Sequence, residues 1–327
     1  MWHAIFHDNV VALIISWAFG IAGILANIYV IINSVRDCTQ KHRRTTSKIH
    51  AFLIANLAAC DLCGASYLAT IASADIYYTK YHCSIFSCGI NGSCNNVTNI
   101  WLISPSCYFA RFISNLSVFM SAMITLIIAA DRSVNIIAPH SKHHITLANI
   151  KKAVAFCWTL GLSVSTTVVI QSVFIINPYS FSDFSMLCSS SDINTLFFRI
   201  YAAISFIFIV FSYTSTLILY FWIFNHLRNV QRKLTCISRI AVGARVGIER
   251  RVGIVTAFLA TTSGVIWLPL LILFMLEISD VQFGDPKLLS QLTIISFLLV
   301  FANASANPIS YTLLTTKNLQ RNSKRWV

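Results

Sequence analysis

The stretch VVALIISWAFGIAGILANIYVII at residues 10–32 decides the fold, because it carries no charged side chain over a length that can cross a membrane. A bilayer core about 30 Å thick needs about 20 mostly apolar residues per helix, since each residue of a helix rises about 1.5 Å. No segment alternates apolar and polar residues as the strands of a membrane barrel do. We therefore predict an all-α membrane protein, a bundle of seven transmembrane helices. The other long apolar runs lie at residues 49–74, 104–134, 150–175, 196–224, 252–276 and 288–314.

The composition agrees with a membrane protein. Of 327 residues, 56% are hydrophobic and only 11% are charged, whereas soluble domains carry about 25% charged residues. The net charge of +13 does not indicate a nucleic-acid partner, which would need a basic face on a soluble fold. We expect one seven-helix bundle at residues 1–314. Residues 315–327 are expected to form a short amphipathic helix and tail that lie on membrane lipids at the cytoplasmic side.

The distribution of the 24 Lys and Arg residues predicts the orientation. Most of them lie in the first, third and fifth connections and in the C-terminal tail, and positive residues are retained on the cytoplasmic side. The N-terminus is therefore expected outside and the C-terminus inside, in a multi-pass protein of the plasma membrane. Residues 1–9 lack the basic region of a signal peptide, so the first span should direct its own insertion. The basic inner face would suit anionic lipid or an acidic partner, or it only fixes the topology.

The first outer loop carries two glycosylation sequons, at Asn91 and Asn96. Half of the 10 cysteines also lie in or beside outer loops, where disulfides persist. The pairing within the first outer loop stays open. These cysteines are Cys83, Cys88, Cys94, Cys107 and Cys188.

Charged and strongly polar residues at membrane depth are functional candidates, because a charge there costs a few kcal/mol or more. Two prolines also interrupt spans, and a proline removes a backbone hydrogen bond and bends a helix. The candidates are Asp61 in the second span, Asp131 and Arg132 at the end of the third, Trp267 and Pro269 in the sixth, and Asn303, Asn307 and Pro308 in the seventh.

Taken in order, these residues resemble the rhodopsin-like (class A) G-protein-coupled receptors over the whole chain. The resemblance rests on Asn56-Leu57-Ala58 before Asp61, Cys107 ahead of Asp131-Arg132, Trp158, Trp267-Leu268-Pro269 and Asn307-Pro308-Ile309-Ser310-Tyr311.

Within that class the chain looks most like the transmembrane part of the leucine-rich-repeat hormone receptors, the relaxin and glycoprotein-hormone receptor group. Residues 67–75, 210–213 and 303–313 carry this likeness. Those receptors have a large repeat-bearing ectodomain, whereas residues 1–9 precede the first span here. Either that ectodomain was lost, or the sequence is a fragment, or the subgroup differs.

The resemblance implies a disulfide between Cys107 and Cys188 that ties the third helix to the second outer loop. It also implies that Asp61, Ser121, Asn303 and Asn307 bind a sodium ion in the inactive state, and their oxygen atoms suit a hard cation. The alternative is a water-filled hydrogen-bond network without sodium.

The resemblance further implies that Asp131 holds Arg132, which restrains the sixth helix through Glu249 when inactive and contacts the G protein when active. The alternative is two independent interfacial charges. This chain has Ser133 where the family has a tyrosine, which puts coupling strength in doubt.

Three aromatic residues match activation switches of the family. Tyr213 and Tyr311 would swing inward near Arg132, and Trp267 would lie beneath the ligand pocket, with Pro269 and Pro308 as the bending points. The alternative for each aromatic is packing against lipid or core.

The function we expect is a receptor that transmits an extracellular signal to a heterotrimeric G protein, with no enzymatic activity and no cofactor. Retinal is excluded because residues 288–311 contain no Lys. Amine ligands are disfavoured, since the third span has no aspartate where amine receptors place one, and a peptide or protein hormone, a lipid or a tethered segment stays open. Charged candidates for the outer pocket are Asp75, Arg111 and Glu277. The alternatives are a transporter or channel, for which internal repeats are lacking, and a receptor-like protein that no longer signals.

Overall fold

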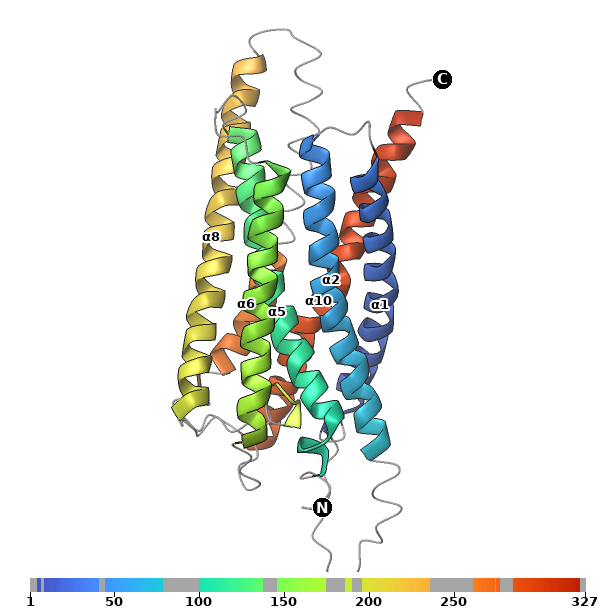
Figure 1. Cartoon of the computed structure of the whole chain (residues 1–327), viewed down its shortest axis with the longest axis vertical. Coiled ribbons are helices and arrows are strands. Elements are labelled where there is room, and N and C mark those ends of the chain that lie inside the picture. Colours follow the sequence, from blue (N-terminus) through green and yellow to red (C-terminus); the bar gives the residue numbers. More distant parts are fainter. Residues whose placement is uncertain are drawn as a thin grey trace, which may run out of the picture.

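The computed structural model describes residues 5–6, 9–40, 45–78, 100–137, 146–174, 186–189, 196–235, 261–273, 275–276 and 285–323, of which 198, 231–235, 286 and 309–323 are described by their backbone only. Long helices make up most of this part of the chain (Figure 1). They are α1 (Val10–Thr39), α2 (Thr45–Tyr77), α5 (Pro105–Ile137), α6 (Leu147–Phe174), α8 (Leu196–Thr235) and α10 (Pro286–Ser323).

Six helices are long and apolar enough to cross a membrane, and a shorter apolar helix covers Thr261–Leu273 within the predicted sixth span. The prediction of an all-α bundle of seven membrane helices is confirmed. Several helices continue past the predicted spans; α8, for example, ends at Thr235 rather than at 224. Hydropathy marks where the lipid ends, whereas a helix with polar, basic residues can continue into water.

The long helices cross the bundle in two opposite directions. Figure 1 shows α1, α5, α8 and α10 running one way and α2 and α6 the other. Helix α2 packs against α1, α5 and α10, and α5 packs against α2, α6 and α8, so α2 and α5 form the centre of the bundle.

Helix α8 lies at the periphery, where Ile207 and Phe211 keep 66% and 63% of their surface exposed. Such a large apolar face is stable only against lipid.

The seam between α1 and its neighbours is built from small residues. A Cβ atom on Gly23 would stand 2.8 Å from the Cβ of Ala65, so only glycine permits this approach. Across the same seam, Ser305 Oγ donates to the carbonyl of Phe19 at 2.6 Å and Asn27 Nδ2 donates to the carbonyl of Ala304 at 3.2 Å. Close backbone approach with interhelical hydrogen bonds is typical of membrane helix packing.

The C-terminal segment differs from the expectation in one respect. Helix α10 continues across Pro308 to Ser323. Residues 315–323 are thus helical, but they prolong α10 instead of forming a separate helix. Their position on the inner leaflet stays a prediction.

Candidate functional site

The outer end of the bundle is closed by a disulfide between Cys107 at the start of α5 and Cys188. Both residues are completely buried, and their Cα atoms are 5.4 Å apart. The predicted disulfide is therefore present. Cys188 has a φ of 49°, in the left-handed region that non-glycine residues adopt at a cost of about 1–2 kcal/mol. Strong contacts must therefore hold the segment 186–189 in place.

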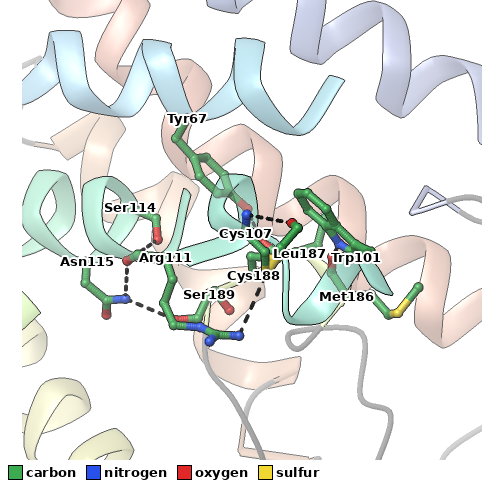
Figure 2. Close-up of a disulfide and its surroundings, with 11 residues drawn as sticks. Tyr67, Trp101, Cys107, Arg111, Ser114, Asn115, Met186, Leu187, Cys188 and Ser189 are labelled. Carbon is green, nitrogen blue, oxygen red and sulfur yellow. Dashed lines mark hydrogen bonds between the residues drawn. A yellow bond between two sulfur atoms is a disulfide. The ribbon is translucent and has the colours of Figure 1, made fainter. Parts of the chain in front are cut away.

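Side chains of the bundle supply those contacts (Figure 2). Each one donates a hydrogen bond to a backbone carbonyl of the segment 186–189. The bonds run from Trp101 Nε1 to Met186 (2.9 Å), from Tyr67 Oη to Leu187 (2.6 Å) and from Asn115 Nδ2 to Ser189 (3.0 Å).

A cavity of about 330 Å³ lies among α5, α6, α8, α10 and the helix at 261–273. Ser189 lines it from the outer segment, and Trp267 lines it from the sixth span. The Trp267 ring lies 6.2 Å from the ring of Tyr213, measured between centroids. The structure thus places the predicted Trp267 switch at a cavity and beside the predicted Tyr213 switch.

The expected charged groups of the outer pocket do not line this cavity. Arg111 is 2% exposed and directs its Nη2 toward the Cys107 sulfur at 3.9 Å. Asp75 is buried at the end of α2, where its Oδ1 accepts the backbone N–H of Phe6 at 3.2 Å. Glu277 lies outside the described residues. The N-terminal residue pair 5–6 therefore occupies the Asp75 side of the bundle.

Asp61 lies in the middle of α2 and is 1% exposed. Its Oδ2 accepts a 3.0 Å hydrogen bond from Asn307 Nδ2, and its Oδ1 accepts one of 3.4 Å from Ser121 Oγ. The described part of the chain gives this carboxylate no ion pair with a basic side chain. The carboxylate and hydroxyl oxygens are the ligands that a hard cation prefers, so the donor set fits a sodium ion.

Asn303, the fourth residue of the predicted cluster, is hydrogen-bonded to a residue other than Asp61. Its Nδ2 donates to Ser263 Oγ at 2.7 Å, so it connects α10 to the sixth span rather than to Asp61. Sequence reasoning missed Ser263, because a single serine in an apolar helix carries no distinctive signal.

At the opposite end of α5, Arg132 Nη2 lies 3.8 Å from Asp131 Oδ2. Asp131 is 1% exposed and also accepts a 3.0 Å hydrogen bond from Asn135 Nδ2. Ser133 donates to the carbonyl of Ala130 at 2.9 Å, so its hydroxyl is bonded back into α5. Glu249, the predicted partner of Arg132, lies outside the described residues. The pairing of Arg132 with Glu249 therefore stays a prediction.

Other polar contacts were not foreseen. Trp158 Nε1 donates to Asn56 Oδ1 at 2.9 Å and joins α6 to α2. Both residues belong to the motifs quoted above, but those motifs do not pair them. A polar residue in an apolar run indicates a hydrogen bond, because buried polar groups need partners. The sequence does not show which residue that partner is.

For several predicted site residues the structure gives only a position in a helix, or no description. Pro269 lies on the exposed side of the helix at 261–273, and Pro308 lies inside α10. Tyr311 is described by its backbone only. Outside the described residues are the sequon residues Asn91 and Asn96 and the loop cysteines Cys83, Cys88 and Cys94.

The sequence of the chain is similar to those of known proteins. Residues 26–311 match the family described as 7 transmembrane receptor (rhodopsin family), and the chain belongs to that family. With its apolar helices, this makes it a multi-pass protein of the plasma membrane.

Two receptors within this family are similar to the chain over most of its length. Relaxin receptor 1 of Mus musculus is 24% identical over 94% of this chain and 38% of its own length. The G-protein coupled receptor GRL101 of Lymnaea stagnalis is 24% identical over 94% of this chain and 25% of its own length. The predicted likeness to the relaxin receptor group is thus confirmed, and the chain spans well under half the length of these relatives.

Proposed function

We propose that the protein transmits an extracellular signal to a heterotrimeric G protein by rearranging its helices. One observation carries this proposal: the buried carboxylate of Asp61 is hydrogen-bonded from two other helices, α5 through Ser121 and α10 through Asn307. A buried charge held only by neutral groups is costly. Its partners can therefore be exchanged between two states of similar free energy, which is what a two-state receptor requires.

The polar contacts connect the cavity to this carboxylate. Trp267 lines the cavity on the same helix as Ser263, which binds Asn303 of α10. One turn further along α10, Asn307 binds Asp61. A ligand that moves the sixth span would strain these bonds, each worth about 1 kcal/mol and more where a charge takes part. Differential binding of a few kcal/mol is enough to shift such an equilibrium.

A sodium ion would be held by Asp61 and Ser121, with the side-chain amide of Asn307 beside the carboxylate. The ion would supply the positive charge that the buried carboxylate lacks in the inactive state. The chain's own residues would then have to release it and close around Asp61 when the helices rearrange.

At the inner end, Arg132 would contact the G protein. Asp131, whose Oδ2 lies 3.8 Å from Arg132 Nη2, would hold this arginine while the protein is inactive. Glu249 would restrain the sixth helix through the same arginine. Loss of that restraint favours the state in which a cleft opens for the partner.

The proposal is tested by basal second-messenger output in cells that express the chain, with surface expression measured in parallel. We expect Arg132→Ala to abolish the output and Glu249→Ala to raise it several-fold. Arg36→Ala, an exposed arginine at the inner end of α1, is the matched control and should change nothing. Output equal to that of empty cells for every variant, at normal surface expression, would contradict the proposal and favour a transporter or a silent receptor.

A second candidate is a receptor-like protein that no longer signals. The observation that favours it is Ser133, whose hydroxyl is bonded to Ala130 and offers no ring for packing against the inner connection. If this residue limits coupling, Ser133→Tyr should raise the output. If the unchanged chain gives no output and Ser133→Tyr gives none either, Ser133 is not the reason for the missing signal.

A further inference from the structure

The 330 Å³ cavity is divided into a polar and an apolar end. On α5 the lining residues Ser114 and Asn115 precede Val118 and Phe119 by one turn, and α5 begins at the outer end with Pro105. On α8, Tyr201 and Ser205 likewise come before the lining residues Phe206, Phe208 and Ile209. The polar side chains therefore gather at the outer end, beneath Ser189, and the inner end is apolar.

The polar end is built around one hydrogen-bonded pair. Tyr201 Oη donates to Asn115 Oδ1 at 2.7 Å, while Asn115 Nδ2 donates to the carbonyls of Arg111 and Ser189. Asn115 is thereby fixed in one orientation. The N–H groups of the Asn115 amide and the Tyr201 O–H are already used, but the remaining lone pairs of the amide oxygen and of the phenol oxygen can still accept a hydrogen bond from a hydroxyl group of a ligand.

The lining residues that the structure describes carry no charge. Among the described residues that line the cavity, none is an Asp, Glu, Lys, Arg or His, and the apolar end is closed by rings such as Trp267 and Phe301. A charged ligand group would lose its hydration here without an opposite charge to replace it, at a cost of several kcal/mol. This end of the bundle therefore selects against charged ligands.

The cavity also reaches the side of the bundle. Ile204 of α8 lines the cavity and is 62% exposed, and Val164 of α6 lines it from the adjacent helix. Among the six long helices, α8 packs on α5. In the membrane this side faces lipid, so an apolar ligand can approach through the bilayer rather than through water.

We propose that the cavity among α5, α6, α8 and α10 binds an uncharged, single-chain amphiphile, with its hydroxyl group at the Asn115–Tyr201 pair and its apolar chain against Trp267 and Phe301. The volume lies at the lower end of the range of about 300–1,000 Å³ for ligand pockets, which suits one short chain. This inference deepens the proposed function by naming the ligand class, and it rests on that function only for the ligand's role as a signal.

Photoaffinity labelling of the purified full chain in lipid nanodiscs tests the proposal without any G protein. The probe is decanol carrying a diazirine and an alkyne, compared with the same chain ending in an ammonium or a carboxylate. We expect the alcohol to label peptides of α5 and α8 that line the cavity at least fivefold more than either charged probe. Excess unlabelled decanol should remove this labelling.

Two neighbouring positions on α8 give a matched pair. Ala202 lines the cavity, whereas Ala203 is exposed and does not. Ala202→Phe should reduce labelling by the alcohol at least fivefold, and Ala203→Phe should leave it unchanged. Equal labelling by the three probes, equal labelling of the two variants, or labelling confined to lipid-facing peptides would overturn the proposal. Because probe preference and peptide mapping use the unmodified chain, a variant that fails to fold does not remove the test.

The outcome is separable from that of signalling. Specific labelling without second-messenger output would leave the binding site standing and contradict the proposed function. Output without specific labelling would contradict the site and leave the function standing.

Discussion

Asn307 of α10 donates a 3.0 Å hydrogen bond to Asp61 of α2, so a carboxylate buried in the middle of α2 is held by a residue 246 positions away in the sequence. Ser121 of α5 binds the other oxygen of the same carboxylate. Three helices thus meet at one charge. Any movement of α10 relative to α2 must break or replace this contact, which makes it a natural point for control of the bundle.

Sodium dependence tests the role of this charge. Sodium chloride, compared with an equal concentration of choline chloride, should raise the Tm of the purified chain by a few degrees, since a ligand at ten times its Kd adds about 1.4 kcal/mol of stability. Asp61→Asn keeps the side-chain shape and removes the charge, so its Tm should not respond. Asp75→Asn, at another buried carboxylate, is the control. A sodium effect that survives Asp61→Asn would contradict the site.

Tyr67→Phe tests the attachment of the segment 186–189. The variant keeps the ring and removes the hydroxyl that binds the carbonyl of Leu187 at 2.6 Å. Because a buried carbonyl loses its partner, the free energy of unfolding should fall by about 1–3 kcal/mol. Tyr29→Phe alters an exposed tyrosine and should be neutral. Equal thermal inactivation of the two variants would argue against the contact.

Loss of either cysteine should have the same effect as loss of both, because each variant removes the same disulfide. Cys107→Ser should cost about 2–5 kcal/mol of stability and lower surface expression. The double variant with Cys188→Ser should be no worse than the single one, because one bond is lost in either case. Strictly additive losses would indicate that the cysteines act separately. Expression is measured by antibody binding to an N-terminal tag on intact cells.

The small-residue seam between α1, α2 and α10 should not tolerate even a methyl group. Gly23→Ala places a Cβ 2.8 Å from that of Ala65 and also against Ser305, so we expect a loss of about 1–3 kcal/mol from overpacking. Gly264→Ala is the control, because a Cβ there meets nothing within 4 Å. Thermal inactivation of purified protein separates the two. A Gly23→Ala variant as stable as Gly264→Ala would show that the seam is looser than described.

The helical bundle could be predicted because apolar runs such as 10–32 leave no other structure in a membrane. The ends of the helices could not, since α1 continues to Thr39 after the apolar run stops. The pairing of Asp61 with Asn307 followed from the resemblance, which supplies three-dimensional information that one sequence lacks. The bond between Asn303 and Ser263 depends on how α10 is rotated toward the sixth span, and no residue pattern encodes that rotation.

The outer pocket shows the same limit. Arg111 and Asp75 are charged residues near the outer ends of spans and were reasonable candidates for ligand contacts. The structure directs Arg111 toward the disulfide and gives Asp75 the backbone of Phe6 as a partner. Whether a side chain near a helix end faces a cavity depends on its place around the helix, and a weakly amphipathic membrane helix does not reveal that place.

The most direct test of the central claim is nucleotide exchange on purified heterotrimeric G proteins of each class, measured with the full chain in lipid nanodiscs. The account predicts that the chain accelerates exchange on at least one class, that Arg132→Ala removes the acceleration, and that Arg36→Ala retains it. No acceleration on any class, with the chain folded and its Cys107–Cys188 disulfide intact and with decanol present or absent, would contradict the claim that this bundle activates a G protein.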